Sequence, residues 1–115
     1  MLRQSLQQWE WLIVNDGSTD AAALRALLPL RAADARIRVL DQPNRGLPGA
    51  RNAGVKASRA PLLFFLDSDD LLAPTALEKL AWTLASRPAS AFAGSWTAVF
   101  GAEHLLWRRG APEQR

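Results

Sequence analysis

LLFFLDSDD at residues 62–70 is the stretch of sequence that decides the fold. Five consecutive apolar residues lead directly into carboxylates, which predicts a strand over residues 62–67. An apolar run without polar alternation is typical of a parallel strand that is covered on both faces. Charges at the end of such a strand are costly unless they are solvated or used, so we expect a functional edge there.

The rest of the chain alternates between helix and strand patterns. Short runs rich in apolar, aromatic and branched residues predict three further strands: 9–15, 37–41 and 89–100. Leucine spacing, with Asp20 as an N-cap and Pro74 as a first helical residue, predicts helices: the end of one at 2–8, then 21–31, 49–58 and 74–86. This order favours an α/β fold with an open, mostly parallel sheet and helices on both faces.

The composition of the 115 residues indicates one globular domain. The absence of cysteine excludes disulfides and thiolate metal sites, and suits a reducing compartment. No apolar run approaches the ~18 residues that span a bilayer, and the N-terminus lacks a signal-peptide core, so we expect a cytoplasmic location. The net charge of +3 comes from scattered basic residues, which gives no stripe for a nucleic acid.

Carboxylates follow three of the predicted strands. Ligands of open α/β sheets bind where the strands end, and there the sequence places Asp16, Asp41, Asp67 and Asp69. Carboxylates that share one edge repel each other unless a cation lies between them, and oxygen ligands suit Mg²⁺ or Mn²⁺. The alternative interpretation is that these aspartates only form turns and that Ser68 or Asp70 caps the next helix.

The loop NRGLPGARNAG at residues 44–54 is the other informative stretch. Gly46 and Gly49 permit close approach of the backbone or a positive φ. Arg45 and Arg51 are candidate phosphate donors near a helix N-terminus. A plain loop–helix junction with a solvated Arg51 is the alternative, and neither a dinucleotide fingerprint nor a P-loop is present.

Three segments in order, VNDGSTD at 14–20, the loop at 44–54 and FLDSDD at 65–70, closely resemble the family-two inverting glycosyltransferases of GT-A, Rossmann-like fold. The resemblance covers about residues 5–107. It implies transfer of a sugar, with inversion, from a nucleotide-diphosphate sugar, commonly UDP-linked, to an acceptor hydroxyl. It further implies a role in polysaccharide biosynthesis, with a glycan, a lipid-linked molecule or a protein as acceptor.

The resemblance also implies roles for individual residues. Asp16 matches the aspartate that contacts the nucleotide base, and Arg51 matches the loop beside the nucleotide. Asp67 lies by the ribose in this family, and Asp69 lies on the metal, which is Mn²⁺ or Mg²⁺. The full set of expected site residues is nucleotide-binding Asp16, Gly17, Ser18, Arg51, Asp67 and Ser68, and metal-binding Asp67 and Asp69.

The family pattern extends beyond this chain at both ends. Its first strand would precede Met1 and lie between the strands at 9–15 and 62–67, so we expect a partial domain over 1–115 that lacks this strand. Residues 1–100 would form its core, and residues 101–115 a tail toward the acceptor half. The missing parts could associate with a membrane face. Glu103 and Glu113 are the only late carboxylates, and we assign no catalytic base.

Two other functions are compatible with parts of this pattern. The chain could be a fragment that binds a nucleotide without catalysis. A haloacid-dehalogenase-type phosphatase also places Asp-x-Asp after an apolar strand, but its motif continues with Gly-Thr, whereas Asp70-Leu71 follows here. The lone His104 and the pair at 108–109 are expected on the surface. The five tryptophans are expected in packing, with Trp96 and Trp107 as candidate acceptor contacts.

Overall fold

The computed structural model describes residues 1–95, 97–99 and 105–107. Its elements along the chain are β1 (Trp11–Asp16), α1 (Ala21–Ala33), β2 (Ile37–Gln42), α2 (Gly46–Ala57), α3 (Ala76–Ala85), β3 (Thr97–Val99) and β4 (Leu105–Trp107). The predictions for the first four elements and for α3 are confirmed, with boundaries that move by at most three residues.

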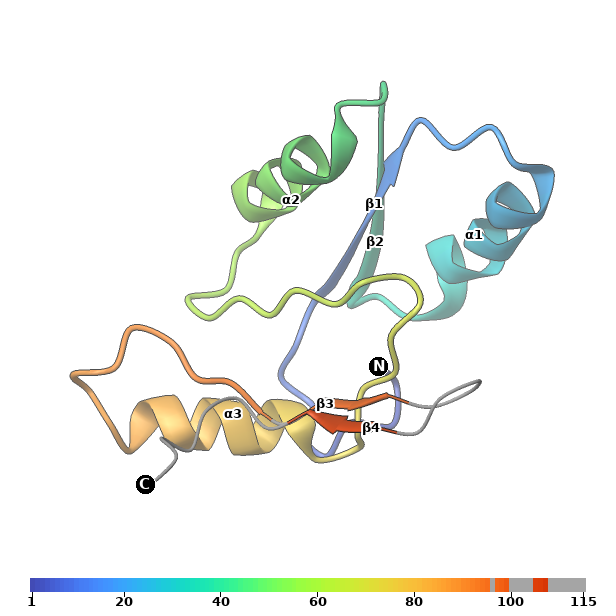
Figure 1. The fold of residues 1–115 in the computed structure, drawn as a ribbon. Coiled ribbons are helices and arrows are strands. Elements are labelled where there is room, and N and C mark those ends of the chain that lie inside the picture. The colour runs from blue at the N-terminus through green and yellow to red at the C-terminus, as the bar shows by residue number, and fades with distance from the viewer. Residues whose placement is uncertain (96, 100–104, 108–115) are drawn as a thin grey trace.

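A parallel pair of strands between two helices forms the centre of the fold. β1 and β2 pair in register from Trp11 opposite Ile37 to Asp16 opposite Gln42, so both strands end at the same edge. Helix α1 packs against β2 and helix α2 packs against β1, and Figure 1 shows the two helices on opposite faces of the pair. The predicted α/β class with helices on both faces is therefore confirmed.

The local sequence explains where these helices begin. Asp20 accepts a hydrogen bond from the Ala23 backbone N–H at 2.8 Å, which confirms the predicted N-cap of α1. Helix α2 begins at Gly46, whose φ of +71° is accessible to glycine at little cost. Helix α3 begins at Ala76, two residues after Pro74 and later than predicted.

The predicted strand at 62–67 is wrong. The structure assigns no strand there, and the side chains that were expected to be covered are 45–53% exposed: Leu62, Leu63, Phe64 and Phe65. In both views this segment passes below the β1–β2 pair and does not run alongside it. An apolar run becomes a strand only when another strand hydrogen-bonds to it, and none of the described residues does so.

Two further predictions of secondary structure need correction. No helix ends at 2–8: the Gln7 side chain hydrogen-bonds to the Gln4 carbonyl, and the Gln4 side chain reaches the distant Ala73 carbonyl. The strand predicted at 89–100 is reduced, within the described residues, to β3, and residues 91–95 are irregular. β3 pairs antiparallel with β4, which the alternating pattern did not predict.

Few of the described side chains are buried. Ile37 at 4% exposure and Gln4 at 2% are the only ones in the part of the chain that the structure describes. Trp82 is 69% exposed, so the prediction that the tryptophans serve packing is wrong for it. Trp9 is half-buried, and the Arg36 guanidinium lies 3.8 Å from its ring centroid.

The remaining sequence predictions lie mostly outside the described residues. These concern Trp96, Glu103, His104, the pair at 108–109 and Glu113. Across the described ranges, none of the helices is long and apolar enough to cross a bilayer.

Candidate functional site

The loop that follows β1 is built around Asn15. Its side-chain oxygen accepts a hydrogen bond from the Ser18 backbone N–H at 3.1 Å, which closes the turn after the strand. Its amide nitrogen donates to Asp41 Oδ1 at 2.9 Å, next to it at the end of β2. The polar ends of the two parallel strands are thus tied together.

Asp16 connects the end of β1 to the start of α2. Its Oδ1 accepts hydrogen bonds from Gln42 Nε2 at 2.6 Å and from the Arg45 backbone N–H at 2.8 Å. The Gln42 hydrogen bond lowers the pKa of this carboxyl most, and the backbone N–H groups and charge of the Arg45 loop add to it. Asp16 is therefore held as a carboxylate directly before a helix N-terminus.

Gly17 allows the two loops to approach each other closely. Its φ is +72°, and a Cβ built on it would lie 2.8 Å from the backbone nitrogen of Asn44. Any side chain at this position would push Asn44 away, and with it the neighbouring Arg45 N–H that Asp16 holds. Glycine is thus needed at position 17 for a structural reason that the sequence alone did not reveal.

Asp41 has a structural role at the end of β2. Arg31 of α1 donates to both of its carboxylate oxygens, at 2.8 and 2.7 Å. The hydrogen bond from Asn15, followed by that from Arg31, lowers the pKa of Asp41. Paired in this way, Asp41 needs no cation to be accommodated at the end of the sheet.

Arg51 connects α2 to the acidic segment. Its Nη2 donates to Asp67 Oδ1 at 2.9 Å, with the two side chains 43% and 52% exposed. Its guanidinium carbon also lies 5.7 Å from the Phe65 ring centroid, within cation–π range. Arg51 is therefore not a free surface residue, although both partners remain open to solvent.

Residues 67–70, the acidic turn, form a tight bend. The Asp70 backbone N–H donates to the Asp67 carbonyl at 3.1 Å, with Ser68 and Asp69 at the tip. Among the described residues no group of three or more His, Asp or Glu side chains gathers. The expected crowding of four carboxylates at one edge is therefore absent in that part of the chain, because the 62–67 segment lies outside the sheet.

The acidic turn nevertheless fits a hard divalent cation in its donor chemistry. Asp67 and Asp69 supply carboxylate oxygens, and Asp69 carries no hydrogen bond or ion pair to any other described residue. Mg²⁺ and Mn²⁺ are commonly held by one or two carboxylates, with water and substrate phosphates as the other ligands. Two carboxylates in a solvent-open turn suit that arrangement.

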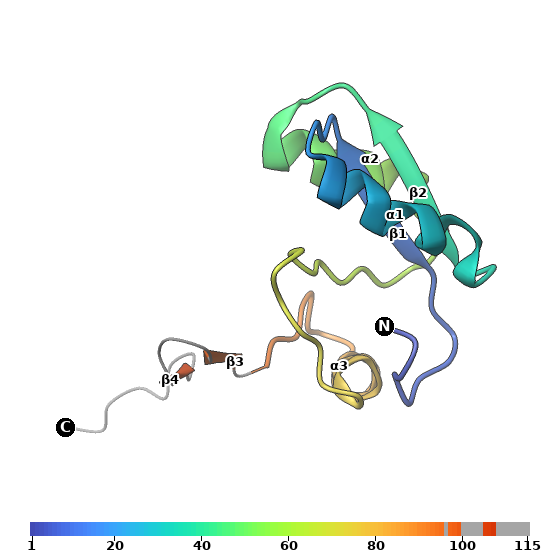
Figure 2. The same ribbon diagram turned by 90° about the vertical axis from the view of Figure 1, so that its right-hand side faces the viewer.

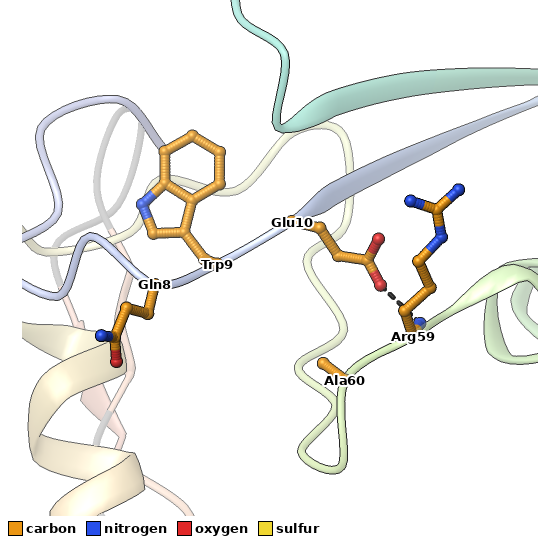
Figure 3. A pocket seen from close by; sticks show the side chains of 5 residues that line it. All are labelled: Gln8, Trp9, Glu10, Arg59 and Ala60. Carbon is orange, nitrogen blue, oxygen red and sulfur yellow. Dashed lines mark hydrogen bonds between the residues drawn. The ribbon is translucent and has the colours of Figure 1, made fainter.

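A cavity of about 270 Å³ lies elsewhere, where the chain enters β1. Figure 3 shows its lining, in which the Glu10 carboxylate accepts the Arg59 backbone N–H at 2.6 Å. That hydrogen bond lowers the pKa of Glu10 most. Glu10 precedes β1 and Asp16 ends it, so this cavity lies at the opposite end of the strand from Asp16.

Sequence reasoning missed Gln42 as a partner of Asp16. The signal was available, because aligning WLIVND with IRVLDQ as parallel strands of equal length places these two residues opposite each other. The Arg51–Asp67 pair had no comparable signal, since it depends on where an irregular segment passes α2. Arg45 takes part through its backbone N–H, whereas the sequence pointed to its side chain.

The sequence matches the family described as "Glycosyl transferase family 2" over residues 1–114. It is 41% identical over 80 residues to "Uncharacterized glycosyltransferase EpsJ" of Bacillus subtilis (strain 168), which covers 70% of this chain and 23% of that protein. It is 39% identical over 77 residues to "Chondroitin synthase" of Pasteurella multocida (strain Pm70), covering 67% and 8%. "O-antigen biosynthesis protein RfbC" of Myxococcus xanthus is 36% identical over 86 residues, covering 74% and 7%. The chain spans less than a quarter of each of these relatives, and it belongs to glycosyl transferase family 2.

Proposed function

We propose that this chain is the nucleotide-sugar-binding part of an inverting glycosyltransferase. The donor is a nucleotide-diphosphate sugar, UDP-linked, and the acceptor is a hydroxyl group. Membership of the family supports transfer in general terms. The single observation that carries the assignment of residues is that α2 connects two of the three segments on which the resemblance rests.

Helix α2 has one contact to each motif. Asp16 holds its first turn through the Arg45 N–H, and its Arg51 holds Asp67 at 2.9 Å. Groups that recognise a nucleotide and its diphosphate must be fixed relative to each other. A single helix of 12 residues performs that task here.

We infer the individual roles from the side-chain atoms of the candidate site that can still bind a ligand. Both hydrogen bonds of Asp16 use Oδ1, which leaves Oδ2 to accept the N–H of a uracil ring, with Gly17 and Ser18 beside it. Arg51 lies beside the nucleotide and holds Asp67 toward the ribose. Asp69, with Asp67, would hold Mn²⁺ or Mg²⁺, which when bound neutralises charge on the departing diphosphate.

The acceptor proposed is a growing glycan. Relatives are named for the synthesis of chondroitin, hyaluronan and O-antigen, and by analogy we assign this chain to polysaccharide biosynthesis. A general base must deprotonate the acceptor hydroxyl for in-line attack, and we assign no residue of this chain to that role.

The first test is the thermal unfolding of the chain with UDP, Mn²⁺, both or neither. A ligand at a hundredfold excess over its Kd stabilises the folded state by about 2.7 kcal/mol, which is roughly 10 °C for a domain of this size. We expect the full shift with both ligands and a smaller one with UDP alone. Asp69→Asn should abolish the contribution of Mn²⁺, while its matched control Asp70→Asn should keep it.

Two outcomes would contradict the proposal. One is a cooperative melt that UDP and Mn²⁺ leave unchanged. The other is an equal Mn²⁺-dependent shift of the melting temperature in Asp69→Asn and Asp70→Asn, which would show that Asp69 does not bind the metal.

A further inference from the structure

Gln4 is the one buried polar side chain among the described residues, with 2% exposure. Both ends of its amide are used. Nε2 donates to the Ala73 carbonyl at 2.7 Å, and Oε1 accepts the Leu77 backbone N–H at 3.2 Å. A buried amide satisfied in this way fixes its partners, because losing it would leave a carbonyl and an N–H unpaired.

The next residue extends the same contact. The Ser5 backbone N–H donates to the Pro74 carbonyl at 2.8 Å, and Ser5 Oγ donates to Glu78 Oε2 at 2.6 Å. Figure 2 shows this N-terminal segment beside the start of α3. Residues 4–5 therefore hold the chain that leads into α3, and we call these contacts the Gln4 clamp.

The first residue that the Gln4 clamp holds is Ala73, three residues after the end of the acidic turn. On the other side of the turn, Arg51 holds Asp67. The turn is thus anchored at both ends by residues distant in sequence, while the Asp69 side chain at its tip forms no hydrogen bond or ion pair with another described residue. The Asp70–Asp67 backbone hydrogen bond shapes the turn itself, and these two anchors set where the turn lies relative to α2 and α3.

We propose that Gln4 is a positioning residue that sets the acidic turn for binding of a divalent cation and diphosphate. This inference rests on the proposed function of the turn. Gln4 itself touches neither ligand. Groups hydrogen-bonded directly to a metal ligand typically contribute about 10–100-fold to metal affinity. Gln4 acts one step further away, through Ala73 and Leu77, so we expect the lower end of that range.

The test compares the full chain with Gln4→Leu, Gln4→Glu and a control. Gln4→Leu removes both hydrogen bonds, whereas Gln4→Glu keeps an acceptor for the Leu77 N–H and loses the donor to Ala73. The control is Gln8→Leu, the same chemical change at an exposed position close in sequence. Two quantities are measured below the melting temperature: amide hydrogen exchange, and the Kd for UDP with and without Mn²⁺.

We expect the Leu77 amide and residues 68–76 to exchange at least about tenfold faster in Gln4→Leu, the effect of one lost buried hydrogen bond. The factor by which Mn²⁺ tightens UDP binding should fall about tenfold, and metal-free UDP affinity should stay at the wild-type value. Gln4→Glu, which buries a carboxylate against the Ala73 carbonyl, should lose at least as much as Gln4→Leu, and Gln8→Leu should match wild type in both measurements.

The results separate this inference from the proposed function. If Mn²⁺ does not change the UDP affinity of the wild-type chain, both the proposed function and the role of Gln4 are overturned. A wild type that responds to Mn²⁺, with Gln4→Leu responding equally, would overturn the role of Gln4 alone. Equal losses of metal-free and metal-dependent affinity in Gln4→Leu would make Gln4 a general stabilising residue and would also overturn it.

Discussion

Replacing Gly17 by alanine tests whether the approach of the two loops holds the candidate site together. Gly17 has a φ of +72°, and its missing Cβ would lie 2.8 Å from the Asn44 nitrogen. Gly46 provides a matched control, because its φ is +71° but the nearest atom to an added Cβ is Pro48 Cδ at 3.9 Å. Both substitutions introduce left-handed strain, and only Gly17→Ala adds an overlap with backbone.

The magnitudes follow from these two contributions. Left-handed strain costs about 1–2 kcal/mol for a residue with a Cβ, and this applies to both variants. In Gly17→Ala the Asn44 backbone must also move, which weakens the hydrogen bond from the Arg45 N–H to the Asp16 carboxylate. A hydrogen bond to a charged group contributes about 1.5–3 kcal/mol, so we expect a total near 3 kcal/mol for Gly17→Ala and near 1 kcal/mol for Gly46→Ala.

Urea unfolding at fixed temperature, followed by circular dichroism, measures the loss of unfolding free energy in the two variants. Thermal unfolding measures the corresponding fall in melting temperature. For 115 residues the unfolding entropy is about 0.24 kcal/mol/K, so the melting temperature should fall by roughly 12 °C and 4 °C. UDP affinity should fall in Gly17→Ala and persist in Gly46→Ala. Equal free-energy losses in the two variants would refute the argument, because the 2.8 Å approach would then have no energetic consequence.

Three further perturbations have defined outcomes. Hydrogen bonds from Arg36 lower the pKa of Asp34 from 3.8 to about 2, so its contribution to stability is present above pH 3.8 and is lost as the pH falls toward 2. Asp34→Asn should therefore lose less stability than wild type across that range, and identical acid unfolding curves would contradict this. Arg51→Gln breaks a half-exposed ion pair and should cost less than about 1 kcal/mol in urea unfolding, while calorimetric UDP affinity falls about tenfold. Arg31→Gln, at a similar pair outside the site, should leave UDP affinity unchanged. Asp16→Ala should weaken UDP binding equally with and without Mn²⁺ and should speed hydrogen exchange at Arg45, and unchanged exchange there would remove Asp16 as the holder of α2.

Local patterns in the sequence predicted the elements whose determinants are local. The Asp20 cap, the leucine spacing of α1 and the branched runs of β1 and β2 each act within a few residues, and all appear in the structure. The apolar segment 62–67 failed as a strand because strand formation needs a neighbour, and apolarity alone cannot supply one.

The candidate site likewise contains residues that the sequence could identify and long-range contacts that it could not. Candidate residues at the ends of β1 and β2 could be identified because parallel strands end at a common edge. Their partners are contacts between distant segments, such as Arg51 with Asp67, 16 residues apart, and Gln4 with Leu77, 73 residues apart. No periodicity encodes such pairs, so they emerged only from the three-dimensional arrangement.

The Gln4 clamp also sets an order of assembly. Its hydrogen bonds span 69 and 73 residues, whereas Asp16 meets Arg45 over 29. Closing the longer loop costs roughly 0.8 kcal/mol more chain entropy. On a ribosome adding about 5–20 residues per second, Gln4 emerges roughly 4 to 15 s before Leu77 does. The strands β1 and β2 with their helices are complete at Ala57, so they collapse first while the N-terminal segment waits without its partner. We therefore expect a nascent chain to form the Asp16 end of the site early and the hydrogen bonds of the Gln4 clamp later.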